Sequence, residues 1–196
     1  MSGHSHWAGI KHQKGIADQK RGRVFSKLLA LIAAAAKTEL NPDFNPRLRT
    51  AIAKARAEKV PSDNIERAIV RAKESADALE ELTFEAYGPG GAALFIEAIT
   101  DNKNRAIQEI KKVLADNHGK WAEVGSVAWA FTRTDADQTQ TNADSALVSP
   151  KPGESGREWK AKFPQALPAE DKLKLDALVA ALEEQEDVQR IYTNAQ

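Results

Sequence analysis

Residues 25–36 carry an apolar stripe with the period of an α-helix, and no other feature constrains the first third of the chain as strongly. Its members follow one another in steps of three and four residues: Phe25, Leu28, Leu29, Ile32, Ala33 and Ala36. Side chains with this spacing share one face of a helix, which has to be buried against other elements. The alanines allow neighbouring helices to approach closely. The stripe therefore predicts a helical bundle.

Two more helices are expected to complete the bundle. One begins near Pro46, after a loop punctuated by two Asn-Pro pairs, and turns four residues inward: Leu48, Ala51, Ile52 and Ala55. The next opens after Pro61, with Ser62 or Asp63 as its N-cap, and has the stripe Ile65, Ala68, Ile69 and Ala72. We predict that residues 1–78 form a basic helical domain. The first twenty residues show little periodicity and are expected to be an ordered arm or a short basic helix.

The pattern changes to strands after Leu79. Alternation over 83–87, the turn GPGG and the apolar run 92–100 predict a β-hairpin. A helix should follow with Ile107, Ile110, Val113 and Leu114 inward, then a third strand over 127–131 with Val127, Trp129 and Phe131 on one face. Past Pro168 we expect a helix with the inward residues Leu173, Leu175, Leu178, Val179 and Leu182, and a last strand over 188–192.

The predicted class is therefore α+β: an N-terminal helical bundle followed by a two-layer α/β domain with the order ββαβ–linker–αβ. The α/β domain takes residues 79–133 and 166–196. Residues 134–165 between them are polar and interrupted by Pro and Gly, which predicts a long linker or loop.

Charge is unevenly divided although the net charge is zero. Residues 1–75 carry 15 Lys/Arg and 7 Asp/Glu, whereas residues 76–196 carry 13 and 21. A basic half suggests a polyanionic partner. Cysteine is absent, which excludes disulfides and Cys-bound zinc, and no apolar run is long enough to cross a membrane. We expect a cytoplasmic protein without a membrane partner; a mitochondrial location is disfavoured because no transit peptide is visible.

The opening residues GHSHWAGIKHQKGIADQKRGRVFSKLL combine cations with aromatic rings. Lys and Arg neutralise phosphates, while Trp and His rings can stack on bases or ribose. The alternative is a solvated basic helix with Trp7 anchored under the bundle. The coincidence of cations and rings favours nucleic-acid contact. A second candidate is the stretch from Asp101 to Arg105, where Asn102 could simply cap a helix.

Other kinds of site have weaker support. His4, His6 and His12 could bind a metal ion, but Lys11 and Lys14 beside them would repel it, so no metal is predicted. The GPGG loop is followed by a strand, and a phosphate loop requires a helix there. No nucleophile is paired with a base in a recognisable order. The acidic cluster at 183–187 is interpreted as solvated charge. We therefore predict no enzyme, no cofactor and no small-molecule substrate.

Several long motifs in this order resemble the YebC/PmpR family of bacterial regulators, which includes the mitochondrial translational activator of cytochrome oxidase subunit one. They are the opening stretch quoted above, NPRLRTAIAKARAEKVPSDNIERAI, FEAYGPGGAALFIEAITDNKNR and GSVAWAF. The resemblance covers residues 2–133 and resumes at 164–194. It implies a helical domain and two α/β domains, one inserted in the other, and binding of nucleic acid or the ribosome without catalysis. The inserted domain, expected after Phe131, is missing here.

The matching positions imply nucleic-acid contacts at these residues: His4, His6, Trp7, Lys11, His12, Lys14, Lys20, Arg21, Lys27, Asn102, Asn104 and Arg105. Three functions stay open: a translation factor on ribosomal RNA, a DNA-binding transcriptional regulator, and a protein–protein adaptor. A mixed arm of Lys, His and Trp suits irregular RNA, where bases are available for stacking. No helix-turn-helix is visible. We therefore favour RNA, although the family's name as a regulator favours DNA.

Overall fold

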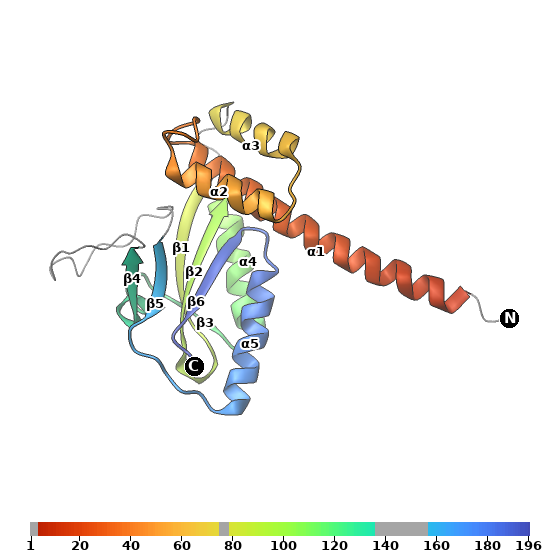
Figure 1. Cartoon of the computed structure of the whole chain (residues 1–196). Coiled ribbons are helices and arrows are strands. Elements are labelled where there is room, and N and C mark those ends of the chain that lie inside the picture. Colours follow the sequence, from red (N-terminus) through yellow and green to blue (C-terminus); the bar gives the residue numbers. More distant parts are fainter. Residues whose placement is uncertain (1–3, 75–78, 136–156) are drawn as a thin grey trace.

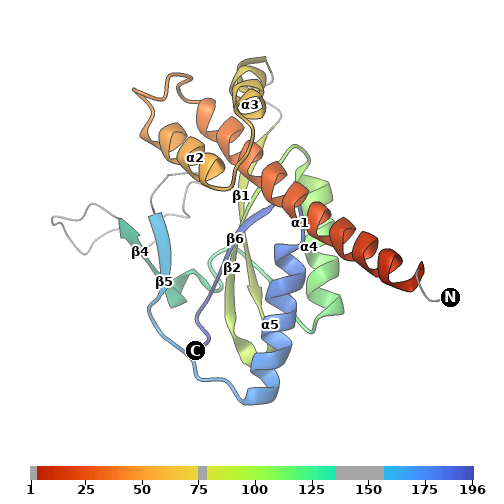
Figure 2. The same ribbon diagram turned by 45° about the vertical axis from the view of Figure 1, so that its right-hand side comes forward.

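The apolar stripe of residues 25–36 lies in a single helix, α1, which runs without interruption from His4 to Ala36 (Figure 1). The computed structural model describes residues 4–74, 79–135 and 157–196. At 33 residues α1 is about 50 Å long. Figures 1 and 2 show its N-terminal half projecting away from the rest of the chain. The helix therefore starts far before Phe25, where the apolar stripe begins. The stripe is confined to the C-terminal part of α1 because that part packs against the other helices.

The other two helices of the bundle are α2 (Pro46–Ala57) and α3 (Ser62–Glu74). The predicted stripes are confirmed: the buried residues of this core include Ile32, Leu48, Ala55 and Ile65. Asn45 caps α2 by accepting a hydrogen bond from Leu48 N at 2.9 Å, and its amide donates to Ala35 O and Glu39 O.

The predicted cap of α3 is wrong. Ser62 is already helical, and the N–H of Ile65 donates to the carbonyl of Pro61. The first turn of α3 is thus closed by the Pro61 carbonyl, one residue before the expected caps.

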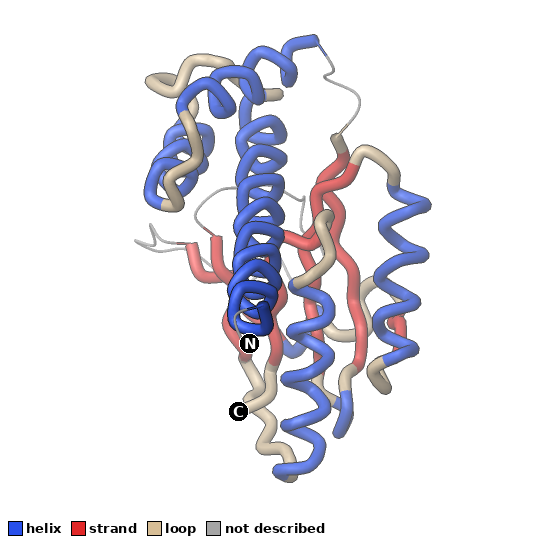
Figure 3. The backbone as a smooth tube through the Cα atoms, turned by 90° about the vertical axis from the view of Figure 1, so that its right-hand side faces the viewer, coloured by secondary structure: helices blue, strands red, loops and turns tan. Residues whose placement is uncertain are grey.

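The α/β domain is built on a four-stranded antiparallel sheet with the order β3-β1-β2-β6. Its strands are β1 (Glu80–Tyr87), β2 (Ala93–Thr100), β3 (Lys120–Ala122) and β6 (Val188–Thr193). The short 3-10 turn η1 (Pro89–Gly91) joins β1 to β2, which confirms the hairpin. Helices α4 (Lys103–Asp116) and α5 (Ala169–Glu183) pack on one face of this sheet (Figure 3).

The predicted third strand lies elsewhere. Residues 128–130 form a 3-10 turn, η2 (Ala128–Ala130). The third strand along the chain is instead β3, which precedes this turn. Because positions three apart share a side of a 3-10 turn, Val127 and Ala130 are fully buried while Trp129 is 59% exposed. The expectation that Val127, Trp129 and Phe131 share one face is wrong. Leu173, expected in the core, is 72% exposed, because it lies off the α5 face that carries the buried residues Leu175, Leu178 and Leu182.

A small second sheet covers the other face of the main sheet. Strands β4 (Phe131–Asp135) and β5 (Arg157–Ala161) pair antiparallel. The ring of Phe95 on β2 lies 5.9 Å from that of Phe131 and 4.7 Å from that of Trp159. The α+β class is confirmed, but the predicted linker 134–165 contains β5, and the domain has a layer that was not expected. Residues 136–156 of that linker, and 75–78 at the predicted domain boundary, lie outside the described residues.

Candidate nucleic-acid interface

The predicted contacts in the opening stretch all lie on α1. Helical spacing places five of them along one stripe, namely His4, Trp7, Lys11, Lys14 and Arg21, and three along a second stripe, namely His6, Lys20 and Lys27, while His12 falls outside both. The side chains of residues 4–16 lie outside the described part. The predicted contacts are thus divided over more than one face of a single helix.

Lys20 and Arg21 are the predicted contacts on α1 whose side chains are described and exposed. Arg21 forms an ion pair with Asp18, one turn earlier on the same helix, at 2.9 Å, and both side chains remain largely exposed. Such a surface pair is weak, so Arg21 can exchange Asp18 for a phosphate at little cost. Lys20 and Arg21 therefore form a cationic surface on this part of α1.

Lys27 has a different environment. Its ammonium group donates a hydrogen bond to the backbone carbonyl of Glu183, at the end of α5. Burial lowers the pKa of Lys27 below its ordinary value, and the nearby Arg23 adds to this effect, while Glu183 raises it. Lys27 therefore anchors α1 to the α/β domain, and a phosphate could reach it only by displacing that contact.

Three more cations of the helical domain bind the acidic α/β domain. Arg23 pairs with Glu184 at 3.5 Å. Arg47 pairs with Glu81 at 2.5 Å, and both side chains are mostly buried. Lys37 donates to the carbonyl of Leu79. Part of the charge segregation seen in the sequence therefore serves to hold the two halves of the chain together.

The second predicted motif lies at the start of α4. Asn102 caps this helix, since its side-chain oxygen accepts a hydrogen bond from Arg105 N at 3.1 Å. The expectation that Asn102 could serve as a helix cap is thus confirmed. The Arg105 guanidinium donates to Asp101 at 2.8 Å and to Asp187 at 3.2 Å. The hydrogen bond and charge of Asp187, followed by those of Asp101, raise the pKa of Arg105. Asn104 is exposed.

Asp187 is an exception to the interpretation of the 183–187 cluster as solvated charge. Its side chain is only 14% exposed, and it accepts a hydrogen bond from the hydroxyl of the buried Thr100 at 3.0 Å in addition to those from Arg105. Glu183, Glu184 and Glu186 are exposed, as that interpretation expects. The contacts of α1 are with the backbone carbonyl of Glu183 and, at 3.5 Å, with the largely exposed carboxylate of Glu184. Asp187 therefore differs from the rest of the cluster, because its side chain joins β2 and α4 to the end of α5.

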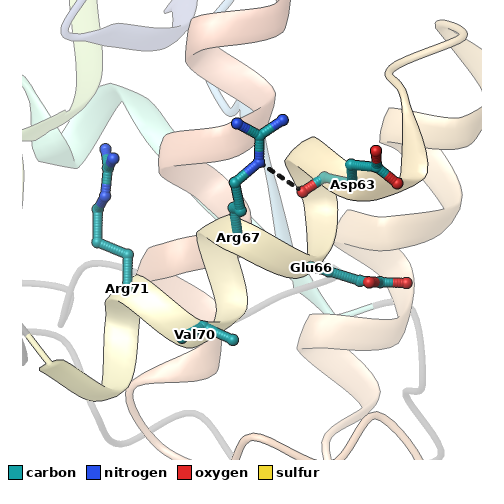
Figure 4. Close-up of a pocket in the computed structure, with 5 residues that line it drawn as sticks. All are labelled: Asp63, Glu66, Arg67, Val70 and Arg71. Carbon is teal, nitrogen blue, oxygen red and sulfur yellow. Dashed lines mark hydrogen bonds between the residues drawn. The ribbon is translucent and has the colours of Figure 1, made fainter.

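The outer face of α3 forms a hollow that sequence reasoning missed. Its volume is about 440 Å³, and the described residues that line it are Asp63, Glu66, Arg67, Val70 and Arg71 (Figure 4). Arg67 donates to Asp63 O at 3.1 Å and to Asn64 Oδ1 at 2.8 Å. The sequence could have indicated this hollow through Arg67 and Arg71, which lie four residues apart on the solvent side of α3. Asp63 and Glu66 balance their charge, so the hollow is not a basic site.

Two absences concern the described residues alone. Among the side chains that the structure describes, which do not include those of residues 4–16, no group of three or more His, Asp or Glu could hold a metal ion. The histidines considered for a metal site, His4, His6 and His12, lie outside these described side chains. None of the helices within 4–74, 79–135 and 157–196 is both long enough and apolar enough to cross a membrane.

Models of one protein family match both the helical domain and the first part of the α/β domain. Residues 5–75 match the model of the TACO1/YebC protein N-terminal domain, and residues 79–148 match that of the TACO1/YebC second and third domain. A "probable transcriptional regulatory protein" of Treponema pallidum subsp. pallidum is 39% identical over 237 residues, which cover 100% of this chain and 97% of the relative. The chain belongs to the TACO1/YebC family. The resemblance to YebC/PmpR is thereby confirmed.

Other relatives in the family show where this chain differs. A protein with the same name from Desulfosudis oleivorans is 53% identical over 136 residues, which are 68% of this chain and 55% of the relative. Over this region the chain matches only about half the length of that relative. The crystal structure of a conserved hypothetical protein, Aq1575, from Aquifex aeolicus has a TM-score of 0.77 at 31% identity and covers 98% of this chain and 97% of that one. The alignment to the Treponema relative is longer than the 196-residue chain, so that relative has residues with no counterpart here.

Proposed function

We propose that this chain is a nucleic-acid-binding regulator of gene expression that acts in translation by binding ribosomal RNA or the ribosome in the cytoplasm. The observation that carries the proposal is the projection of the basic half of α1 away from both cores (Figures 1 and 2). A helix that served only to complete the bundle would end near its last packing contact. The mechanism is electrostatic docking on phosphates, with no bond made or broken.

The contacts described above divide the cations into those held within the chain and those available to a partner. Lys27, Arg23, Lys37 and Arg47 are held by the α/β domain. Lys20 and Arg21 are exposed, and the predicted contacts Lys11 and Lys14 lie further along the projecting helix. At Arg105 and Asn102 the functional groups already have partners within the chain, so they would position the start of α4 instead of binding the first phosphate.

Two alternatives have some support. The name of the relatives, a probable transcriptional regulatory protein, favours a DNA-binding regulator. The acidic surface of the α/β domain next to a basic helix is compatible with a protein–protein adaptor. RNA is preferred because the cations lie along one exposed helix without a turn that would set a recognition helix into a major groove.

The test is a double charge reversal, Lys20→Glu with Arg21→Glu. Its matched control is Lys112→Glu with Lys172→Glu, which changes two exposed cations of the α/β domain and alters the net charge by the same amount. On duplex nucleic acid each lost phosphate contact should reduce the salt dependence of log K by about 0.9 per unit of log salt concentration, so the α1 variant should lose about 1.8. Equal slopes for the variant and the control would refute the role of α1.

Crosslinking in cells separates the proposed partner from the alternatives. Ultraviolet crosslinking followed by sequencing should recover ribosomal RNA from the unaltered chain and much less from the α1 variant. Discrete DNA sites in place of ribosomal RNA would establish the transcriptional alternative. Recovery of neither nucleic acid would refute the proposal and leave the adaptor.

A further inference from the structure

Trp129 and Phe163 form a pair of exposed aromatic rings beside the small β4–β5 sheet. Their side chains are 59% and 50% exposed, and the ring centroids lie 5.7 Å apart with the planes tilted by 41°. Single exposed apolar residues are ordinary on protein surfaces, whereas contiguous exposed apolar patches often mark binding sites. Neither ring belongs to the core between the two sheets, which is filled by Phe95, Phe131 and their neighbours.

The backbone beneath this pair is held by a buried carboxylate. Glu85 on β1 accepts hydrogen bonds from three backbone N–H groups, those of Gly125 at 2.7 Å, Val127 at 2.6 Å and Ala128 at 3.2 Å. These bonds fix the loop that leads directly to Trp129. On the other side, Lys162 N donates to Ala130 O at 2.8 Å and so holds the segment that carries Phe163.

The polar group of Trp129 is satisfied inside the chain. Its indole N–H donates to the carbonyl of Ser126 at 2.7 Å, and the hydroxyl of Tyr87 donates to the same carbonyl at 2.9 Å. What Trp129 offers to a partner is therefore the π surface of its ring. A fixed ring loses little conformational entropy when a flat ligand stacks on it.

Cations lie in the segment that carries Phe163. Lys160, on β5, and Lys162, directly after the end of β5 at Ala161, are both exposed. The ammonium of Lys162 lies 5.3 Å from the centroid of the Phe163 ring. Fixed aromatic faces flanked by lysines are the combination with which proteins bind single-stranded nucleic acids, since the bases stack and the phosphates are neutralised.

We propose that Trp129 and Phe163 are a stacking platform for an unpaired nucleobase of a single-stranded RNA, with Lys160 and Lys162 contacting the adjacent phosphates. This rests on the proposed function, because it gives the α/β domain a contact with the same class of partner. The charge of the flanking residues favours a polyanion over an apolar protein segment. A base paired inside a duplex cannot stack on the platform, because its faces are already covered by neighbouring base pairs.

The experiment measures binding of a twelve-nucleotide single-stranded RNA and of the corresponding RNA duplex. Loss of one base–aromatic stack costs about 1–3 kcal/mol, so Trp129→Ala should weaken single-strand binding by about 5- to 150-fold and leave duplex binding unchanged. Trp129→Phe should restore much of the affinity. Leu173→Ala, which removes an exposed apolar side chain on α5, is the matched control and should bind like the unaltered chain.

A second readout is independent of the affinity. A base stacked on Trp129 should quench its fluorescence, so part of the quenching at saturation should disappear in Trp129→Phe. Equal single-strand affinity of Trp129→Ala and the unaltered chain, or equal weakening for single strand and duplex, would overturn the platform. Because the charge reversal on α1 would still lower binding of both ligands, this failure is distinguishable from failure of the proposed function.

Discussion

Replacing Glu85 tests whether one buried carboxylate holds the loop of residues 125–128. Its three acceptor contacts are unequal: Val127 is fully buried, Ala128 is partly buried and Gly125 is exposed. In Glu85→Ala the N–H of Gly125 can turn to water, but that of Val127 stays buried without its partner. A buried hydrogen bond to a charged group contributes about 1.5–3 kcal/mol, and the weaker Ala128 contact adds about 1 kcal/mol. We therefore expect a loss of about 2.5–4 kcal/mol in the free energy of unfolding.

Glu85→Gln keeps one acceptor oxygen at nearly the same position and should cost about 1–2 kcal/mol. Glu123→Gln changes an exposed carboxylate in the same region and should stay within about 0.5 kcal/mol, which makes it the control. The assay is urea unfolding followed by circular dichroism and by tryptophan fluorescence, because Trp129 lies next to the loop. A loss below about 1 kcal/mol in Glu85→Ala would refute the reasoning, since it would mean that water replaces the carboxylate without penalty.

Two further predictions concern α1. At Gly22, in the interior of the helix, an added Cβ would meet no atom within 4 Å, so Gly22→Ala should raise the free energy of unfolding by about 0.5–1 kcal/mol, measured as a higher urea midpoint; an unchanged or lower midpoint would contradict this. Because burial lowers the pKa of Lys27 in the folded chain below 10.5, the unfolded chain binds more protons just below pH 10.5 and stability should rise with pH there. Lys27→Met should show a smaller rise of stability with pH below 10.5, and identical pH profiles would contradict the assignment.

The helical stripes and the buried strands could be predicted from the sequence because they repeat a local period. Ile32 and Leu48 needed only the spacing of apolar residues around them to be assigned to a core. The two-sided burial of β2 also had a signal, since Ala93 to Ile96 form a continuous apolar run instead of an alternating one. The run was assigned to a hairpin, but it also implied that a second layer covers the other face of the sheet, and this was not predicted.

Other elements gave no reliable local signal. The 3-10 turn at 128–130 has the alternating composition of a strand, and only the contacts of its neighbours decide the conformation. Strand β5 lies in a polar stretch and is stabilised by pairing with β4, which precedes it by more than twenty residues. For the same reason Trp129 was predicted to share one strand face with Val127 and Phe131, so its pairing with Phe163 could not be expected.

The sequence by itself determined the helical bundle, the β-hairpin, the two helices and the last strand of the α/β domain, the uneven charge and the family. Only the tertiary structure decided which charges remain available to a partner. Lys27 and Lys20 are alike in the sequence, yet Lys27 meets Glu183, a residue 156 positions away, while Lys20 stays exposed. The spacing of apolar residues predicts which face of an element is buried, because that spacing involves only residues close together in the sequence. The partner of a charge depends on which distant element packs against it, and that is set by the fold as a whole.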